Sequence, residues 1–242
     1  MLAAAYAAPR RIRFLLKGST LKTHIILSGG ADSATLAYHL ADAGHSLTAI
    51  TYDYGQRHRK ELDSAAAIAK ALGIEHNVVN ISGIAPLLKG SSLTDDIDVP
   101  HGHYQADNML LTVVPNRNTI MLSIAWGVAC SAGSEFLAYG AHAGDHFIYP
   151  DCRPDYVAQL EIAFRMGTEG HRHENMRLIA PFVDWNKGKI IARGLELGVP
   201  YELTWTCYEG GDKPCGKCGS CVERLEAFAQ AGSTDPVQYA AA

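Results

Sequence analysis

Two groups of residues in this 242-residue chain have types and spacings that indicate chemistry. The first is residues 28–33, Ser-Gly-Gly-Ala-Asp-Ser, which combine two hydroxyl groups, two glycines and the carboxylate of Asp32. Glycines let the backbone approach an anion closely, and a helix that starts here would direct free N–H groups at it. A carboxylate repels phosphate oxygens unless a Mg2+ ion lies between them. The run therefore predicts a site for a magnesium-bound polyphosphate.

The second group is a set of four cysteines near the C-terminus. Three of them are spaced three residues apart and are interleaved with glycines, so their thiolates can turn toward one point. Four thiolates that leave no position open are typical of a structural zinc site. An iron–sulfur cluster is the alternative for the same ligands. The expected ligands are Cys207, Cys215, Cys218 and Cys221.

Polar residues also follow other expected strands. The run from Tyr52 to His58, which includes Tyr54 and Gln56, is a candidate wall for adenine and ribose, although a polar loop before a helix would look the same. Arg117 is expected at the N-terminus of a helix, where its charge opposes the helix dipole. An anion shared by Arg117 and the helix end would explain the placement. The alternative is a solvated arginine beside the neighbouring Asn118.

Residues 140–154 mix glycines, prolines, aromatic residues and charges. Asp151 could accept the N–H groups of a guanine-like edge, because a carboxylate offers only acceptors. Arg153 could bind a carboxylate or phosphate through two parallel hydrogen bonds from its planar guanidinium group. The alternative is that the two side chains pair with each other. Cys152 between them could suggest a thioester intermediate, but we do not expect it to act as a nucleophile.

The elements that must position these residues alternate along the chain. Short apolar, β-rich runs are expected as strands at 23–27, 46–54, 75–81, 135–140 and 176–180, and helices are expected at 32–43, 58–72, 118–132, 154–166, 187–197 and 222–231. Alternating strands and helices imply a parallel sheet with right-handed crossovers. Residues 82–116 interrupt this alternation of strands and helices and are expected to be a functional loop or a partly structured insertion. The fold class is therefore α/β with a doubly wound, mostly parallel sheet.

Composition excludes several other classes. Hydrophobic residues make up 48% and charged residues 19% of the chain, which is typical of a globular protein. The run of apolar residues needed for a membrane span, roughly 18, is absent from the sequence. The formal net charge is −4, which argues against nonspecific electrostatic binding to nucleic acid. We expect no nucleic-acid or membrane partner and a cytoplasmic location.

Three segments are expected from the sequence. Residues 1–21 are expected to be a disordered basic leader or the product of an upstream start codon, with a transit peptide or a basic arm as the alternatives. Residues 22–200 are expected to form the nucleotide-binding α/β domain. Residues 201–242 are expected to form a zinc-binding segment packed on the same domain.

Residues 28–33 resemble the PP-loop of the ATP pyrophosphatases. In that family the loop holds the departing pyrophosphate while the enzyme transfers AMP to a substrate oxygen. The resemblance implies a Rossmann-like fold of the adenine nucleotide alpha hydrolase type. The Walker lysine pattern and the dinucleotide fingerprint GxGxxG are absent from this position of the sequence.

From about residue 24 to residue 236, the order and spacing of motifs are similar to those of the 7-cyano-7-deazaguanine synthase family of queuosine biosynthesis. Thr206 stands where that family usually has serine, and the basic leader lies outside the resemblance. The motifs that carry it are residues 28–33, Tyr54-Gly55-Gln56, Pro115-x-Arg117-Asn118, Tyr149-Pro150-Asp151-Cys152-Arg153, Lys187, Thr204-Trp205-x-Cys207-Tyr208 and the three later cysteines.

The resemblance implies a carbon–nitrogen ligase that converts 7-carboxy-7-deazaguanine and ammonia to 7-cyano-7-deazaguanine (preQ0). ATP adenylates the carboxylate, and ammonia then gives the amide. A second ATP activates the amide oxygen, and loss of AMP leaves the nitrile. Each activation releases AMP and pyrophosphate. A homodimer is implied by the family alone.

The resemblance also implies roles for individual residues. Catalytic roles fall to Asp32, which supports Mg2+, to Ser33, and to Lys187, which steadies phosphate. ATP binding is expected from Leu27, Ser28, Gly29, Gly30, Ala31, Asp32, Ser33, Ala34, Thr35, Leu36, Ala37, Tyr54 and Gln56. Substrate binding is expected from Arg117, Asn118, Asp145, Tyr149, Asp151 and Arg153. The sequence does not identify a general base.

Two related enzymes are alternatives. One is a PP-loop relative that adenylates a different acceptor in an anti-phage or peptide-modifying system. The other is a tRNA thiolase, which needs two cooperating redox cysteines near the loop and an RNA-binding module. Only Cys130 and Cys152 lie outside the four-cysteine group, and Cys130 falls in an apolar helical stretch.

Overall fold

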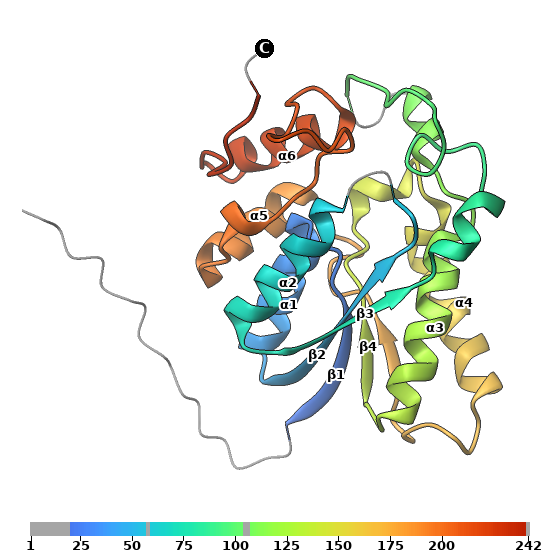
Figure 1. Cartoon of the computed structure of the whole chain (residues 1–242). Coiled ribbons are helices and arrows are strands. Elements are labelled where there is room, and N and C mark those ends of the chain that lie inside the picture. Colours follow the sequence, from blue (N-terminus) through green and yellow to red (C-terminus); the bar gives the residue numbers. More distant parts are fainter. Residues whose placement is uncertain (1–19, 57–58, 104–106, 241–242) are drawn as a thin grey trace, which may run out of the picture.

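A five-stranded parallel sheet lies at the centre of the computed structural model, which describes residues 20–56, 59–103 and 107–240 (Figure 1). Its strand order is β3-β2-β1-β4-β5 and every neighbouring pair is parallel. The doubly wound parallel sheet expected from the sequence is therefore confirmed. The strands are β1 (Leu21–Ile26), β2 (His45–Asp53), β3 (Glu75–Asn80), β4 (Phe136–Ala138) and β5 (Arg177–Ile179).

Helices cover both faces of this sheet (Figure 1). One face carries α1 (Ala31–Asp42), α2 (Lys60–Leu72) and α5 (Lys187–Leu197), and the other carries α3 (Arg117–Ser131) and α4 (Pro154–Gly167). Helix α6 (Gly219–Gln230) packs against α5 and forms an outer layer. Helices α1, α2, α3 and α4 each lie in sequence between two consecutive strands, as the crossovers of a parallel sheet require.

Each face of the sheet has its own apolar core. Leu36 and Ile190 are fully buried on the α1 and α5 side. Leu122 is fully buried and Trp126 is 2% exposed on the α3 side, where the Trp126 indole stacks on Phe164. A parallel sheet needs apolar cover on both faces, which explains the near-continuous apolar strands.

The chain crosses the sheet in both directions from β1. It first proceeds through α1 to β2 and β3, and only later returns to place β4 on the other side of β1. The loops that leave the carboxyl ends of β1 and β4 therefore diverge, and a crevice opens between them. This reversal of strand order is where open α/β sheets bind ligands.

Residues 82–116 are partly structured, with short 3-10 helices at η1 (Ser82–Leu87) and η2 (Asp107–Thr112). Part of this insertion touches the cysteine segment, because His101 pairs with Cys218 in an antiparallel bridge. The Gly102 N–H also donates to the Lys217 carbonyl at 3.1 Å. The insertion therefore docks on the C-terminal segment.

Helix α6 begins three residues earlier than the sequence predicted, at Gly219 instead of residue 222. Cys218 is its extended N-terminal cap, so the last cysteine turn continues directly into the helix. Glycine and cysteine at this junction are typical of a loop, so the sequence pattern placed the start of the helix too late.

A buried ion pair ties the end of the chain to helix α6. Arg224 is 2% exposed, and its Nε and Nη2 atoms lie 2.6 and 2.9 Å from the two carboxylate oxygens of Asp235. The Arg224 Nη1 donates to Thr204 Oγ1 at 2.6 Å. The division of the chain at residues 200 and 201 stays a prediction, and most of the expected basic leader lies outside the described residues. No helix in the described part of the chain is long and apolar enough to span a membrane.

Candidate active site

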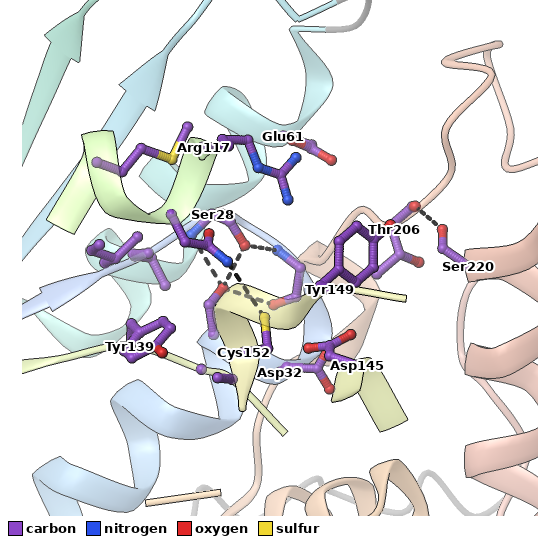
Figure 2. A pocket seen from close by; sticks show the side chains of 18 of the residues that line it. Ser28, Asp32, Glu61, Arg117, Tyr139, Asp145, Tyr149, Cys152, Thr206 and Ser220 are labelled. Carbon is purple, nitrogen blue, oxygen red and sulfur yellow. Dashed lines mark hydrogen bonds between the residues drawn. The ribbon is translucent and has the colours of Figure 1, made fainter. Parts of the chain in front are cut away.

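A cavity of about 260 Å3 opens at the carboxyl edge of the sheet, where the loops after β1, β2 and β4 meet (Figure 2). Helices α3 and α5 and the C-terminal segment complete its walls. Its polar and charged lining residues are Ser28, Asp32, Ser33, Thr51, Tyr52, Tyr54, Gln56, Glu61, Arg117, Asn118, Tyr139, His142, Asp145, Tyr149, Lys187, Thr206, Tyr208, Ser220 and Glu223.

The loop after β1 is held by its own serines. The Oγ atoms of Ser28 and Ser33 lie 3.0 Å apart, and the Ser33 hydroxyl donates to the Gly30 carbonyl at 3.2 Å. Gly30 caps helix α1 with no side-chain hydrogen bond, so the first N–H groups of the helix can serve an anion. The arrangement suits a phosphate at the start of α1.

Gly29 brings helix α2 close to this loop. Its φ of 89° lies in the left-handed region, and a Cβ added there would lie 2.2 Å from the main-chain oxygen of Glu61. Only glycine meets both conditions. The first turn of α2 is therefore packed directly against the loop after β1, residues 27–30, which we call the phosphate loop for the role that its sequence predicts.

A buried chain of charges crosses the floor of the cavity. The Lys187 Nζ lies 3.1 Å from Asp32 Oδ2 and 2.7 Å from Glu223 Oε2. His142 is 2% exposed, and its Nε2 lies 3.5 Å from Asp145 Oδ2 and 3.8 Å from Asp32 Oδ2. Lys187 and Asp32 reach this point from α5 and α1, which lie side by side.

These contacts move the pKa values of the buried groups. Burial alone would raise the pKa of Asp32, but the charges of Lys187 and His142 outweigh it and hold the pKa below its usual value. Burial would lower the pKa of Lys187, but Asp32 and Glu223 hold it well above the usual range. Burial raises the pKa of Glu223 despite Lys187. Asp32 is therefore an anion and Lys187 a cation at neutral pH.

The second oxygen of Asp32 fits a hard cation. Asp32 Oδ1 is buried and has no hydrogen-bond partner in the described part of the protein. A buried carboxylate oxygen without a donor is costly unless a cation or a proton reaches it. Oxygen ligands of this kind suit Mg2+ together with substrate phosphates.

An aromatic subsite surrounds Arg117 on the opposite wall. Its Nη1 donates to the Tyr54 hydroxyl at 3.5 Å, and its Cζ lies 5.8 Å from the centre of that ring. Tyr149 and Tyr208 lie close enough to raise its pKa further, against burial that would lower it. Burial raises the pKa of Tyr54 to about 12, so its hydroxyl is neutral. Flat apolar faces around one guanidinium suit a heteroaromatic acid.

The structure brings many of the predicted site residues together. Those that line the cavity are Leu27, Ser28, Gly30, Asp32, Ser33, Tyr54, Gln56, Arg117, Asn118, Asp145, Tyr149 and Lys187. Those that belong to the same loop or helix without lining the cavity are Gly29, Ala31, Ala34, Thr35, Leu36 and Ala37. Thr35, for example, turns its hydroxyl to Tyr201 at 2.7 Å, inside the core.

Two expected substrate ligands do not line the cavity. Asp151 Oδ2 accepts the main-chain N–H of Asn118 at 3.3 Å, so it caps the start of α3. Arg153 is exposed, and its Nε donates to the His146 carbonyl at 2.9 Å. The pairing of Asp151 with Arg153 is not among the described contacts either. Their assignment to substrate binding stays a prediction without a supporting contact.

Several lining residues were not singled out from the sequence. Glu61 and Glu223 lie in helices, where nothing in the local pattern separates them from surface acids. His142 follows β4 as the ligand-binding edge requires, and that position was the available signal. Cys152 also lines the cavity, but burial raises the pKa of its thiol well above the usual range.

The four cysteines gather into one cluster beside this cavity. Their Sγ atoms all lie within 4.8 Å of one another, and those of Cys215 and Cys221 are 4.0 Å apart. Tetrahedral zinc with bonds of about 2.3 Å requires Sγ atoms roughly 3.8 Å apart. The main-chain N–H of Cys215 donates to Cys207 Sγ at 3.3 Å, and thiol hydrogen bonds from Cys218 and Cys221 lower the pKa of Cys207. The cluster can hold a metal ion and fits zinc.

Residues 22–232 match the protein family described as "Queuosine biosynthesis protein QueC". The chain belongs to the QueC family. The match spans the phosphate loop, the Arg117 subsite and all four clustered cysteines. The resemblance found in the sequence motifs is thereby confirmed.

Curated relatives carry one name. A 7-cyano-7-deazaguanine synthase from Marinobacter nauticus is 53% identical over 216 residues, which cover 89% of this chain and 96% of that protein. The enzyme of the same name from Brucella anthropi is 50% identical over 220 residues, or 90% of this chain and 94% of that protein. A 7-cyano-7-deazaguanine synthase 1 from Colwellia psychrerythraea is 49% identical over 218 residues, covering 90% and 98%. This QueC chain therefore spans nearly the whole length of these relatives.

Proposed function

We propose that this chain is a carbon–nitrogen ligase that converts 7-carboxy-7-deazaguanine and ammonia to 7-cyano-7-deazaguanine at the expense of ATP. The observation that carries the proposal is the shared cavity, in which the phosphate loop after β1 faces the aromatic subsite around Arg117. An enzyme that adenylates a heteroaromatic acid needs these two subsites within reach of each other. Family membership and the shared name of the relatives support the same conclusion.

The loop side of the cavity receives ATP. The hydroxyls of Ser28 and Ser33 and the N–H groups at the start of α1 hold the pyrophosphate that departs. Lys187 adds a positive charge on the same side. Asp32 would hold Mg2+ through its unpartnered Oδ1, and the ion would supply charge neutralisation on the phosphate oxygens. Tyr54 and Gln56 line the cavity at the end of β2 and are placed to border the nucleoside.

The opposite side receives the acid. Arg117 pairs with the substrate carboxylate and turns one of its oxygens toward the phosphate loop. The rings of Tyr54 and Tyr149 border the deazaguanine, and Asn118 offers an amide at the start of α3. Tyr149 is fixed by its hydroxyl, which lies 2.6 Å from Thr112 Oγ1. The rigid wall orients the carboxylate before reaction.

The chemistry follows from this placement. The carboxylate oxygen attacks the α-phosphorus of ATP, and pyrophosphate leaves into the loop. A carboxylate is inert to ammonia, but the acyl-adenylate carries AMP as a leaving group, so ammonia displaces it and gives the amide. The amide oxygen then attacks a second ATP, and loss of AMP leaves the nitrile. Donors that are already oriented stabilise the negative charge that builds on the leaving pyrophosphate.

Further assignments belong to the same proposal. The cysteine cluster binds one structural zinc ion per chain, and the four thiolates leave no position for a substrate. The enzyme acts in the cytoplasm on small molecules and forms a homodimer. Neither tRNA nor a membrane takes part in the reaction.

The test is a reconstituted reaction with ATP, Mg2+, ammonium and 7-carboxy-7-deazaguanine. The expected products are AMP, pyrophosphate and the nitrile, each formed only when the deazaguanine is present. Asp32→Asn should abolish turnover and keep its zinc, because the cysteine cluster is a separate site. Formation of ADP, or AMP release that ignores the deazaguanine, would contradict the proposal.

A further inference from the structure

Glu61 is a carboxylate of the cavity that makes no hydrogen bond or ion pair in the described structure. It lies in the first turn of α2, whose main chain packs against Gly29 of the phosphate loop. Its side chain lines the cavity together with Arg117 (Figure 2). Among the described residues it makes no hydrogen bond and no ion pair, whereas Asp32 and Glu223 share Lys187.

The surroundings of Glu61 raise the pKa of its carboxyl group toward neutral pH. Burial raises the pKa of its carboxyl to about 7, although the charge of Arg117 lowers it. The titratable groups that face it from other elements in the described structure are Arg117 of α3 and Tyr54 after β2. Arg117 stays charged and Tyr54 stays neutral near pH 7, because both pKa values are raised. A group with a pKa near the working pH is best suited to take up and release a proton.

The reaction needs such a group, because nitrogen loses protons in both halves of the sequence. In the proposed function the carboxylate that reacts is held by Arg117, and Glu61 lines the same cavity, close enough to that guanidinium for the two charges to interact. We propose that Glu61 is the general base that removes protons from the substrate nitrogen. This inference rests on the proposed function and adds the catalytic residue that the sequence does not identify.

The proton balance of the first half is simple. The lone pair of ammonia forms a C–N bond to the acyl carbon of the adenylate, and the nitrogen becomes an ammonium group. Glu61 accepts one proton from that nitrogen. The C–O bond to AMP then breaks with its electron pair on AMP, and the amide remains with its two protons. Glu61 passes its single proton to the departing phosphate or to water.

The second half uses the same base. The amide oxygen forms a bond to the α-phosphorus of ATP, pyrophosphate leaves, and the nitrogen becomes an iminium group with two protons. Glu61 accepts one of these protons, and the other passes to the departing phosphate or to water. The C–O bond to AMP breaks, and the triple bond to nitrogen forms. Glu61 returns its proton to solvent through the open cavity.

Other titratable groups of the cavity are less suited to this role. Lys187 is a cation that is held by Asp32 and Glu223. His142 is 2% exposed and faces the carboxylates of Asp32 and Asp145. The pKa of the Cys152 thiol is raised far above neutrality by burial, so it holds its own proton.

The experiment separates adenylation from proton removal in Glu61→Gln. Exchange of labelled pyrophosphate into ATP, driven by 7-carboxy-7-deazaguanine without ammonia, reports adenylation. Nitrile formation with ammonia reports the complete reaction. We expect exchange within about threefold of wild type and nitrile formation reduced about 100-fold or more, the range for loss of a general base. Asp63→Asn, an exposed acid two residues along the same helix, is the matched control and should leave both rates unchanged.

Two further readouts exclude a purely structural role. With free ammonia held constant at every pH, the wild-type rate should rise through about pH 7 as Glu61 loses its proton, and Glu61→Gln should lack this rise. Formate should restore part of the rate in Glu61→Ala. Unchanged nitrile formation in Glu61→Gln, or loss of exchange together with nitrile formation, overturns the assignment. Absence of exchange in the wild-type chain overturns the proposed function, and this inference falls with it.

Discussion

The ammonium group of Lys187 lies 3.1 Å from Asp32 Oδ2, so helix α5 neutralises one oxygen of the carboxylate that follows β1. The other oxygen, Asp32 Oδ1, is buried and has no hydrogen-bond partner in the described structure. One oxygen of this carboxylate is thus held by a lysine, and the other oxygen is still available to a cation. The lysine therefore fixes the orientation of this carboxylate.

Replacement of this lysine should damage both stability and activity. In Lys187→Met, Asp32 and Glu223 lose the cation between them, and removal of one partner of a buried pair costs about 3–5 kcal/mol. Nitrile formation should fall at least about 100-fold, as is typical when an oriented charge is lost. Urea unfolding and the AMP assay measure the two effects. The exposed Lys189→Met is the control, and a Lys187 variant as stable as that control would contradict the role of the pair.

Gly29→Ala should disrupt the contact between the phosphate loop and α2. The new methyl group would meet the Glu61 carbonyl at 2.2 Å in a left-handed backbone, so one of the two elements must shift. We expect ATP binding to be lost and the melting temperature to fall. Gly73→Ala is the control, because the φ of 67° at Gly73 is also left-handed but nothing lies within 4 Å of the added Cβ. It measures the cost of the left-handed backbone alone, about 1–2 kcal/mol. Equal destabilisation of the two variants would show that the close contact does not matter.

Cys218→Ser should release the metal from the cysteine cluster. Binding of a structural metal contributes directly to folding, so the variant and the chelated wild type should both melt at a lower temperature. Elemental analysis should give one zinc per chain for the wild type and for Cys130→Ser, whose cysteine lies outside the cluster. Retention of a full zinc equivalent by Cys218→Ser would mean that the metal lies elsewhere.

Glu61 should make stability fall as pH rises. Burial raises the pKa of Glu61 in the folded protein to about 7, above the ordinary glutamate value of 4.5, so the folded protein binds more protons than the unfolded chain between these values. The folded state is therefore weakened progressively across this window, and the penalty is complete above pH 7. We expect Glu61→Gln to be more stable than wild type at pH 8 by up to about 2 kcal/mol, after allowance for partial exposure, and equal to it near pH 4.5. A constant difference at both pH values would mean that Glu61 titrates normally.

Local patterns identified most of the fold. The apolar β-branched residues of β1 and the alanines of α2 ending at Gly73 are signals that tertiary context rarely overrides. The start of α6 was displaced because Cys218 serves both the cluster and the helix cap, and a sequence pattern does not separate two roles at one residue. The insertion at 82–116 was harder, because its order depends on docking to the distant Lys217.

The sequence predicted site residues that lie within a short motif. It did not predict residues that reach the cavity only through packing between distant segments. Ser28 and Asp32 were found because the loop geometry and the chemistry occupy one short segment. Glu61 and Glu223 reach the cavity only because α2 and α6 pack beside that segment. Asp151 shows the opposite case, since a polar side chain near the right strand turned inward to cap α3.

The cavity includes Trp205, Thr206 and Glu223 as well as residues that follow β1, so its walls come from opposite ends of the chain. During synthesis the phosphate loop emerges from the ribosome long before its counterpart does. A nascent chain therefore lacks part of the cavity wall for most of its translation. The cavity is complete only after the residues around the cysteine cluster have been synthesised.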